Sequence, residues 1–195
     1  VLPLYPGFAA VLLLRHGHQH YQDMSKLANL HGMIALLRDG FHADSEGGHI
    51  ELAEDSSPVI DYPFNDYLWD GFRRAFLSMT EIEFAAGAKA VRVAHLDSPW
   101  YRSWSEARTG IQELKFRSSA FSAASAHVMG GLAMGEDLEQ CMVDSQGKYH
   151  YLENLWVLDG SVFPTSIGAN PQLSIYAMAC KQATELVAKI KSGVV

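Results

Sequence analysis

The last third of the chain limits the possible folds more than any other part of the sequence. It opens with a loop of small residues around His127, which covers residues 125–135. After this loop, residues 154–158 are almost wholly apolar and predict a strand that is buried on both faces. The strand is followed at once by Asp159, Gly160 and Ser161. These three residues could let the backbone approach a ligand closely or could form a plain turn, and this segment alone favours neither interpretation.

A helix is predicted to begin shortly after this segment. Asn170 has the side chain of an N-cap, Pro171 suits the first helical position, and Gln172 follows. Lys189 and Lys191 fall in the predicted last turn, where the helix dipole favours cations. Apolar residues recur at helical spacing and predict a broad buried stripe made of Leu173, Tyr176, Ala177, Cys180, Ala183, Leu186, Val187 and Ile190.

The first 120 residues contain shorter and more mixed patterns. Residues 66–86 and 105–116 repeat apolar side chains every three or four positions and predict two amphipathic helices. Short apolar or alternating runs predict strands at 33–38, 48–52, 58–64 and 88–95. We therefore predict an α+β fold with a mostly antiparallel sheet and flanking helices.

The charge and length of particular segments limit the partners of the chain. The 195 residues carry a formal net charge of −7, and residues 39–72 include nine acidic residues without Lys or Arg. Such a face repels phosphate, which argues against a nucleic-acid partner. The apolar run at 1–14 falls short of the roughly 20 residues that a membrane helix needs, so we expect a buried element or an internal segment of a longer protein. Cys141 and Cys180 are expected to be two buried free thiols.

Two features leave alternatives open. On a strand, His16, His18 and His20 would share one face and could bind a metal, but no nearby thiol or carboxylate completes the set. A polar loop is the preferred interpretation, and no metal site is predicted. The aromatic residues of 98–104 form either a small satellite core or the wall of a ligand site, and the satellite core is preferred.

The order of the C-terminal motifs resembles the C-terminal signature of the glucose-methanol-choline (GMC) family of FAD-dependent alcohol oxidoreductases. The resemblance rests on the His127 loop, the apolar segment with its Asp-Gly-Ser ending, and the Asn-Pro helix start. It implies that His127 and Asn170 are catalytic and flank the reactive face of the flavin. It also implies that FAD is contacted by Asp159, Gly160, Ser161, Asn170, Pro171 and Gln172.

The reaction implied by the resemblance is the oxidation of an alcohol. A neutral imidazole at His127 would accept the hydroxyl proton, and the Asn170 amide would hold the oxygen while hydride passes to N5 of FAD. The positive end of the final helix would stabilise negative charge on the reduced flavin. The aromatic loop and the apolar start weakly favour an apolar alcohol as substrate.

The resemblance also concerns domain organisation. The sequence lacks the family's glycine-rich dinucleotide-binding fingerprint, so we expect a C-terminal part whose partner is the N-terminal FAD-binding portion of the same protein. Residues 1–153 would form the substrate-binding domain, and the strand and helix of residues 154–195 would return to the FAD-binding domain. Two other functions stay open: a non-catalytic binding or interaction module of the same scaffold, and a small metalloprotein that uses the three histidines.

Overall fold

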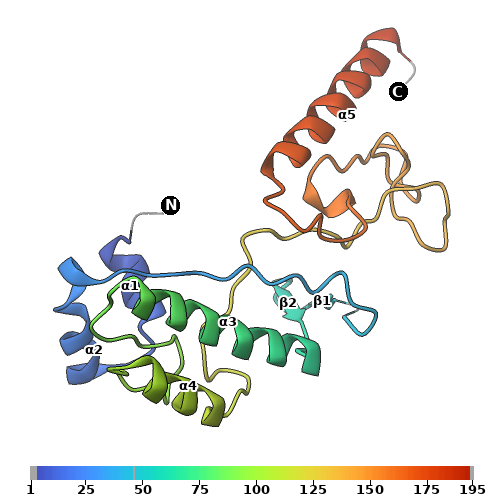
Figure 1. Ribbon diagram of the computed structural model, residues 1–195. Helices are drawn as coiled ribbons and strands as arrows, with labels where there is room; N and C mark the ends of the chain where they lie inside the picture. The colour runs from blue at the N-terminus through green and yellow to red at the C-terminus, as the bar shows by residue number, and fades with distance from the viewer. Residues whose placement is uncertain (1–3, 46, 194–195) are drawn as a thin grey trace. The chain divides into compact units, whose positions relative to one another are not determined.

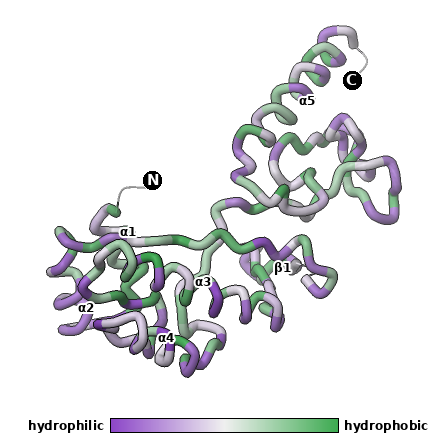
Figure 2. The backbone as a smooth tube through the Cα atoms, viewed as in Figure 1, coloured by the Kyte–Doolittle hydropathy of each residue, from purple (hydrophilic) through white to green (hydrophobic). Residues whose placement is uncertain are grey.

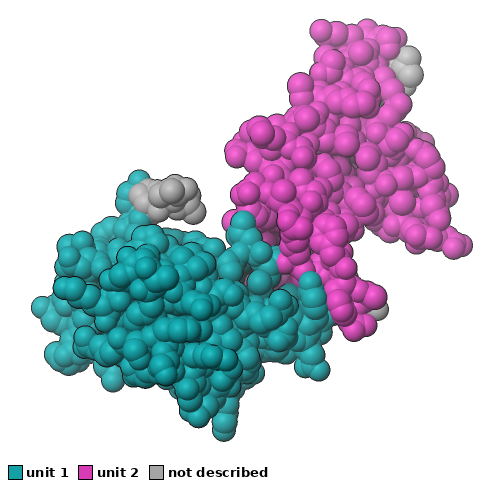
Figure 3. Space-filling view, viewed as in Figure 1, with its two compact units in different colours: residues 1–37, 64–124 teal, residues 38–63, 125–195 magenta. Residues whose placement is uncertain are grey.

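The structure is a computed structural model that describes residues 4–45 and 47–193 (Figure 1). Its contacts divide into two compact units, each built from two separate stretches of sequence. Unit 1 comprises residues 1–37 and 64–124, and unit 2 comprises residues 38–63 and 125–195 (Figure 3). The domain boundary predicted after residue 153 falls inside unit 2 and stays a prediction about the family's domains.

The described residues form five α-helices and one two-stranded antiparallel sheet, which confirms the predicted α+β class. Unit 1 is helical. Its α-helices are α1 (Pro6–Leu12), α2 (Gly17–Met24), α3 (Asp66–Ala85) and α4 (Trp104–Glu113), and a 3-10 turn, η1, covers Leu27–Asn29.

The long helix α3 confirms the helix predicted at 66–86. The Asn65 side chain accepts a hydrogen bond from the Leu68 backbone N–H at 3.0 Å, so an orphan donor of the first turn is satisfied. Beyond the last turn, Gly87 takes a φ of +94°, a left-handed conformation that glycine adopts without steric cost. The helix predicted at 105–116 is also confirmed, although α4 ends at Glu113.

The core of unit 1 gathers around α3 and α4, which pack against each other. Tyr101 is only 2% exposed and Trp104 packs at the edge of this core. The aromatic loop therefore packs into a hydrophobic core, but this is the core of unit 1 itself and not the separate satellite core that was predicted. The buried members of the cluster are Phe76, Val93, Tyr101, Ala107, Ile111, Leu114 and Phe121.

Two of the predicted strands are wrong. Residues 33–38 have no regular secondary structure, and residues 88–95 form only single bridges, Val91 with Tyr101 and His95 with Phe121. A strand is stable only when it pairs with a neighbour over several residues. In the described part of the chain, neither segment has such a neighbour.

The N-terminal region also departs from prediction. The apolar run was predicted at 1–14, and its residues 1–3 lie outside the described part of the chain. Residues 6–12 of the run form α1, in which Ala9 is buried but Val11 is 73% exposed. The histidine tract is not a polar loop, because His16 is the N-cap of α2 and the other two histidines lie within that helix. The strand geometry that a metal site would need is therefore not formed, and the described residues contain no group of three potential ligands.

Unit 2 contains a hairpin that confirms the strands predicted at 48–52 and 58–64. Strands β1 (His49–Leu52) and β2 (Pro58–Asp61) are antiparallel, with Ile50 opposite Ile60. All eight residues of the two strands are exposed.

The buried strand predicted at 154–158 is wrong. This segment makes only one bridge, between Lys148 and Trp156, and its residues are exposed or half-buried. An apolar run becomes a buried strand only inside a sheet, and unit 2 has no further described strand beside it. A short 3-10 turn, η2 (Gly160–Val162), follows directly.

The final helix is α5 (Gln172–Ser192), and its surface differs from prediction. The predicted buried stripe is wrong, because Leu173 is 81% exposed and Tyr176 is 60% exposed, and Val187 and Ile190 are exposed as well. Figure 2 shows hydrophobic and hydrophilic positions alternating along this helix. The predicted basic last turn is confirmed, and the helix ends at a left-handed Gly193.

Two further sequence expectations concern cysteines and membranes. Cys141 and Cys180 are free thiols as predicted, but Cys141 is half-buried and Cys180 is exposed on α5. Within residues 4–45 and 47–193, no helix combines the length and the apolar character that a membrane crossing requires.

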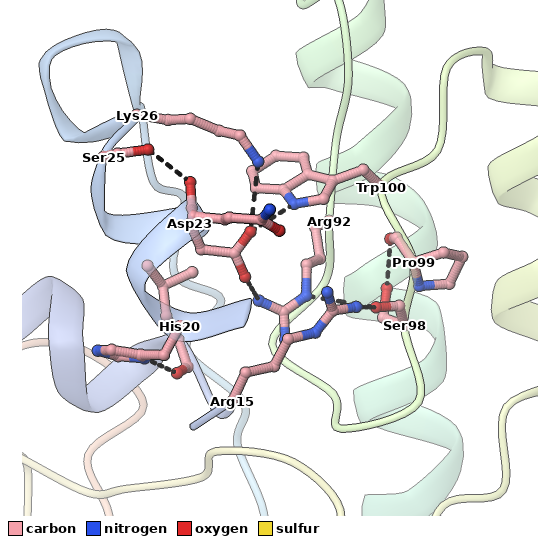
Figure 4. A network of polar contacts seen from close by, with 11 residues as sticks. Arg15, His20, Asp23, Ser25, Lys26, Arg92, Ser98, Pro99 and Trp100 are labelled. Carbon is pink, nitrogen blue, oxygen red and sulfur yellow. Dashed lines mark hydrogen bonds and ion pairs between the residues drawn. The ribbon is translucent and has the colours of Figure 1, made fainter. Parts of the chain in front are cut away.

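A buried ionic network joins α2 to the loop before α4 (Figure 4). The Asp23 carboxylate accepts hydrogen bonds from Arg92 Nη1 at 2.9 Å and from Trp100 Nε1 at 2.8 Å. Arg15 Nη2 and Arg92 Nε both donate to the carbonyl oxygen of Ser98. The side chains of Asp23 and Arg92 are 3% and 2% exposed, so each depends on its partner for solvation.

Replacing Asp23 by Asn is expected to destabilise unit 1 by about 3 kcal/mol, because the Arg92 charge would stay buried without its counter-ion. Urea unfolding measures the change. The matched control is Asp70→Asn, which breaks an exposed pair with Arg74 and should cost about 0.5 kcal/mol or less. Equal losses in the two variants would contradict the expectation.

The same carboxylate gives stability a defined pH dependence. Burial raises the pKa of Asp23, but the Trp100 hydrogen bond and the charges of Arg92 and Lys26 together outweigh it and lower the pKa. The ionised group therefore stabilises the fold above its unfolded pKa, and this contribution is lost as the pH falls through the lower folded pKa. The stability difference between the wild type and Asp23→Asn should narrow below about pH 4.

Candidate active site

The loop that carries His127 is attached to the Asp159–Val162 turn by backbone hydrogen bonds. Three successive pairs join them: Gly130 N–H to Gly160 O at 3.3 Å, Leu132 N–H to Ser161 O at 3.0 Å, and Met134 N–H to Val162 O at 2.9 Å. Gly130 and Gly131 have φ values of +87° and +99°, which turn the chain from His127 into this ladder. His127 thus stands just before an ordered segment and is half-buried.

The turn itself is stabilised by Asp159. Its Oδ1 accepts from the Ser161 backbone N–H at 2.8 Å and from Ser161 Oγ at 2.5 Å, which caps η2. Gly160 between them is buried. These residues were predicted to contact FAD, and in the structure their hydrogen bonds hold the His127 loop.

Asn170 has a different place from the predicted one. It is not the N-cap of α5; Pro171 occupies that position with helical φ and ψ and makes no side-chain cap. The Asn170 side chain instead turns to the loop, where its Nδ2 lies 3.2 Å from Nε2 of His127. Two residues separated by 43 positions are thereby brought into direct contact.

An open pocket of about 340 Å³ lies beside this pair. Ile175 and Tyr176 form part of its wall but were not predicted as site residues. They lie one turn after Gln172, and helical spacing places them on a similar face. Gln172 Nε2 donates to the Tyr176 hydroxyl at 2.8 Å. The pocket is lined by Ala126, His127, Asn170, Pro171, Gln172, Ile175 and Tyr176.

The geometry of the pair suits one shared oxygen. If the Asn170 amide donates, His127 Nε2 must be the unprotonated, accepting nitrogen. A hydroxyl that donates to Nε2 and accepts from Nδ2 needs the two nitrogens about 4.6 Å apart. The direct contact would therefore open by a little more than 1 Å when a hydroxyl takes its place, which rotation of the exposed Asn170 side chain can supply.

The residues present fit a flavin at the start of α5. The first-turn N–H groups of this 21-residue helix are not capped by a side chain, so they remain available to an anionic group. Gly160 makes no open cradle, because a Cβ there would meet Ile175 and Val128. The fit therefore rests on the helix start, with Pro171 and Gln172, and on the neighbouring His127–Asn170 pair.

The chain belongs to the GMC oxidoreductase family and corresponds to a C-terminal portion of such a protein. The model of the family's C-terminal region matches residues 43–179, which is more than half of the chain and includes every residue of the pocket.

Particular relatives agree with this assignment. The chain is 36% identical over 118 residues to a GMC-type oxidoreductase of Mycobacterium tuberculosis, covering 60% of the chain and 18% of the relative. It is 28% identical over 184 residues to long-chain-alcohol oxidase FAO4A of Arabidopsis thaliana, covering 90% of the chain and 24% of the relative. It is 39% identical over 64 residues to cholesterol oxidase of Acinetobacter baumannii, covering 33% of the chain and 12% of the relative. The chain thus spans less than a quarter of the length of these relatives.

Replacing Asp159 by Ala is expected to lower the stability of unit 2 by about 1 kcal/mol, because η2 loses its cap. Asp159→Asn is the matched control, since it keeps an oxygen that can accept from Ser161. Thermal unfolding compares the two. An Ala variant as stable as the Asn variant would show that the cap contributes nothing.

Proposed function

We propose that the chain is the substrate-side part of a flavin-dependent alcohol oxidoreductase. In this proposal His127 accepts the proton of the substrate hydroxyl, and Asn170 donates a hydrogen bond to its oxygen. The observation that supports it most is the contact between His127 and Asn170 at the edge of a pocket. Asn170 lies just before the N-cap of α5, and its side chain turns to the loop, where it meets a histidine 43 positions away.

His127 acts as the general base in this proposal. Its half-buried ring keeps Nε2 at the pocket, where it can reach a substrate hydroxyl directly. As the hydroxyl loses its proton, negative charge develops on the oxygen, and the Asn170 N–H stabilises it. Family membership and relatives named as alcohol and cholesterol oxidases support this assignment.

FAD, when bound, would supply the acceptor for the hydride that leaves the alcohol carbon. We propose that the start of α5, with Pro171 and Gln172, lies against the flavin ring, and that its free N–H groups stabilise negative charge there. The turn formed by Asp159, Gly160 and Ser161 would lie beside the cofactor through its backbone, because the two side chains bond to each other.

The exposed apolar side of α5 belongs to the same proposal. Leu173, Val187 and Ile190 are 81%, 48% and 56% exposed in the chain alone. We propose that the N-terminal FAD-binding portion of the same protein covers them, which would bury apolar surface that is otherwise in water.

Replacing His127 by Ala in the full-length flavoprotein should reduce alcohol oxidation by roughly 10²–10⁴-fold, the usual loss for a positioned general base. Steady-state turnover of a panel of primary and secondary alcohols measures the effect. His49→Ala is the control, since that residue is an exposed histidine on β1 in the same unit. Normal turnover by a His127→Ala protein with full flavin content would remove His127 from the reaction.

The 195-residue chain alone is expected to bind FAD with a Kd weaker than about 1 μM, because it lacks the glycine-rich turn that binds the phosphates. Isothermal titration calorimetry tests this, with the full-length protein as the positive control. Micromolar or tighter binding by the chain alone would overturn the proposed division of labour.

A further inference from the structure

We propose that Gly160 positions His127 against the first turn of α5, and that its missing side chain sets the alignment of His127 with Asn170. This inference rests on the proposed function of the pair. Gly160 does not reach the pocket itself and acts through its neighbours Val128 and Ile175.

The packing around Gly160 carries the inference. A Cβ at this position would lie 2.9 Å from Ile175 Cδ1 and 3.2 Å from the carbonyl oxygen of Val128. Ile175 lines the pocket on α5, and Val128 is the residue next to His127. Gly160 therefore lies against both the helix and the histidine loop.

The need for glycine here is one of space and not of backbone conformation. The φ of Gly160 lies outside the left-handed region, so alanine could adopt the same backbone. The carbonyl of Gly160 also accepts the first hydrogen bond of the ladder that carries the loop, from Gly130. A methyl group at position 160 would thus press on both elements while the ladder holds the turn in place.

A methyl group at position 160 would displace two neighbours that lead to the His127–Asn170 pair. The Ile175 side chain would have to turn, and it forms part of the pocket wall. The Val128 carbonyl would have to move by a few tenths of an ångström, and His127, the adjacent residue, would move with it. Because the rate depends steeply on the alignment of reacting groups, we expect kcat to fall about tenfold, with a smaller change in KM.

The test uses the full-length flavoprotein and four variants. Gly160→Ala introduces two contacts, with Ile175 Cδ1 and with the Val128 carbonyl oxygen, and Ile175→Val removes the first of them. In the double variant, the space left by Cδ1 gives the added methyl group room to shift by a few tenths of an ångström away from the Val128 carbonyl, so both contacts should be relieved. Gly48→Ala is the control for crowding alone, because its Cβ would meet the Asp61 carbonyl oxygen and the Tyr62 side chain in the same unit, outside both the pocket and the His127 loop. Flavin absorbance, thermal stability, kcat, KM for 1-octanol and benzyl alcohol, and the pH profile of kcat/KM are measured for each.

We expect Gly160→Ala to lower kcat and alter the pH profile at full flavin content, and the double variant to recover most of the loss. Gly48→Ala should lose stability but keep its kcat and pH profile. The proposal is overturned by an unchanged kcat and pH profile in Gly160→Ala, or by losses in Gly160→Ala and Gly48→Ala that simply follow stability. If Gly160→Ala is too unstable to purify, the double variant decides, since it should turn over nearly as fast as Ile175→Val.

Crystal structures of the full-length wild type and variants separate this proposal from the proposed function. A wild type that binds flavin but oxidises no alcohol would refute the function. The distance between His127 Nε2 and Asn170 Nδ2 would still decide the role of Gly160. That distance should exceed 3.5 Å, the limit of a hydrogen bond, in Gly160→Ala and return in the double variant. An unchanged 3.2 Å contact in Gly160→Ala would refute the positioning role.

Discussion

The arrangement of the site depends on a short backbone ladder between residues 130–134 and residues 160–162. Three N–H groups of the histidine loop donate to three successive carbonyl groups of the η2 turn. Backbone pairing of this kind does not depend on side-chain rotamers, so it gives the loop a defined path without a strand or helix of its own. His127 lies three residues before the first hydrogen bond of the ladder, and its ring reaches the pocket.

The parts of the site in unit 2 are arranged around this ladder. Asp159 caps the turn that accepts the hydrogen bonds, Gly160 allows α5 to pack closely on the turn, and α5 brings Asn170 to the histidine. The helix start supplies uncapped N–H groups at the same place. A polar pair, an apolar wall and the positive end of a helix thus meet around one pocket, although none of the described strands lies among the residues that line it.

Local patterns predicted the elements whose stability is local. The helix at α3 has an N-cap, a periodic apolar face and a glycine stop, and each of these is visible in the sequence. The hairpin β1–β2 was recognisable because its partners are close in sequence. The strands expected at 88–95 and 154–158 failed, because a strand requires a neighbour and an apolar run does not say whether the chain supplies one. The prediction of a buried stripe on α5 was wrong for the same reason, because helical spacing does not show whether the chain supplies a surface that covers it.

The site was predictable only in part. The proximity of His127 and Asn170 followed from resemblance to a family and not from any local rule, and spacing alone would have made Asn170 an N-cap. Ile175 was not predicted as a site residue, because a residue in a pocket wall and a residue in a core have the same helical spacing in the sequence. The packing role of Gly160 was out of reach, because it depends on atoms from three segments.

The exposed hairpin has a consequence for the behaviour of the chain in solution. Two short strands with Ile50, Leu52 and Ile60 in water offer unpaired edges to other molecules. Glu51 and Asp61 lie on the same strands, within the acidic segment that carries no Lys or Arg. Like charges on two such edges repel, so these carboxylates act as a barrier to self-association. This barrier weakens as acid protonates the carboxylates or salt screens them, and the chain alone is then most exposed to edge-to-edge aggregation.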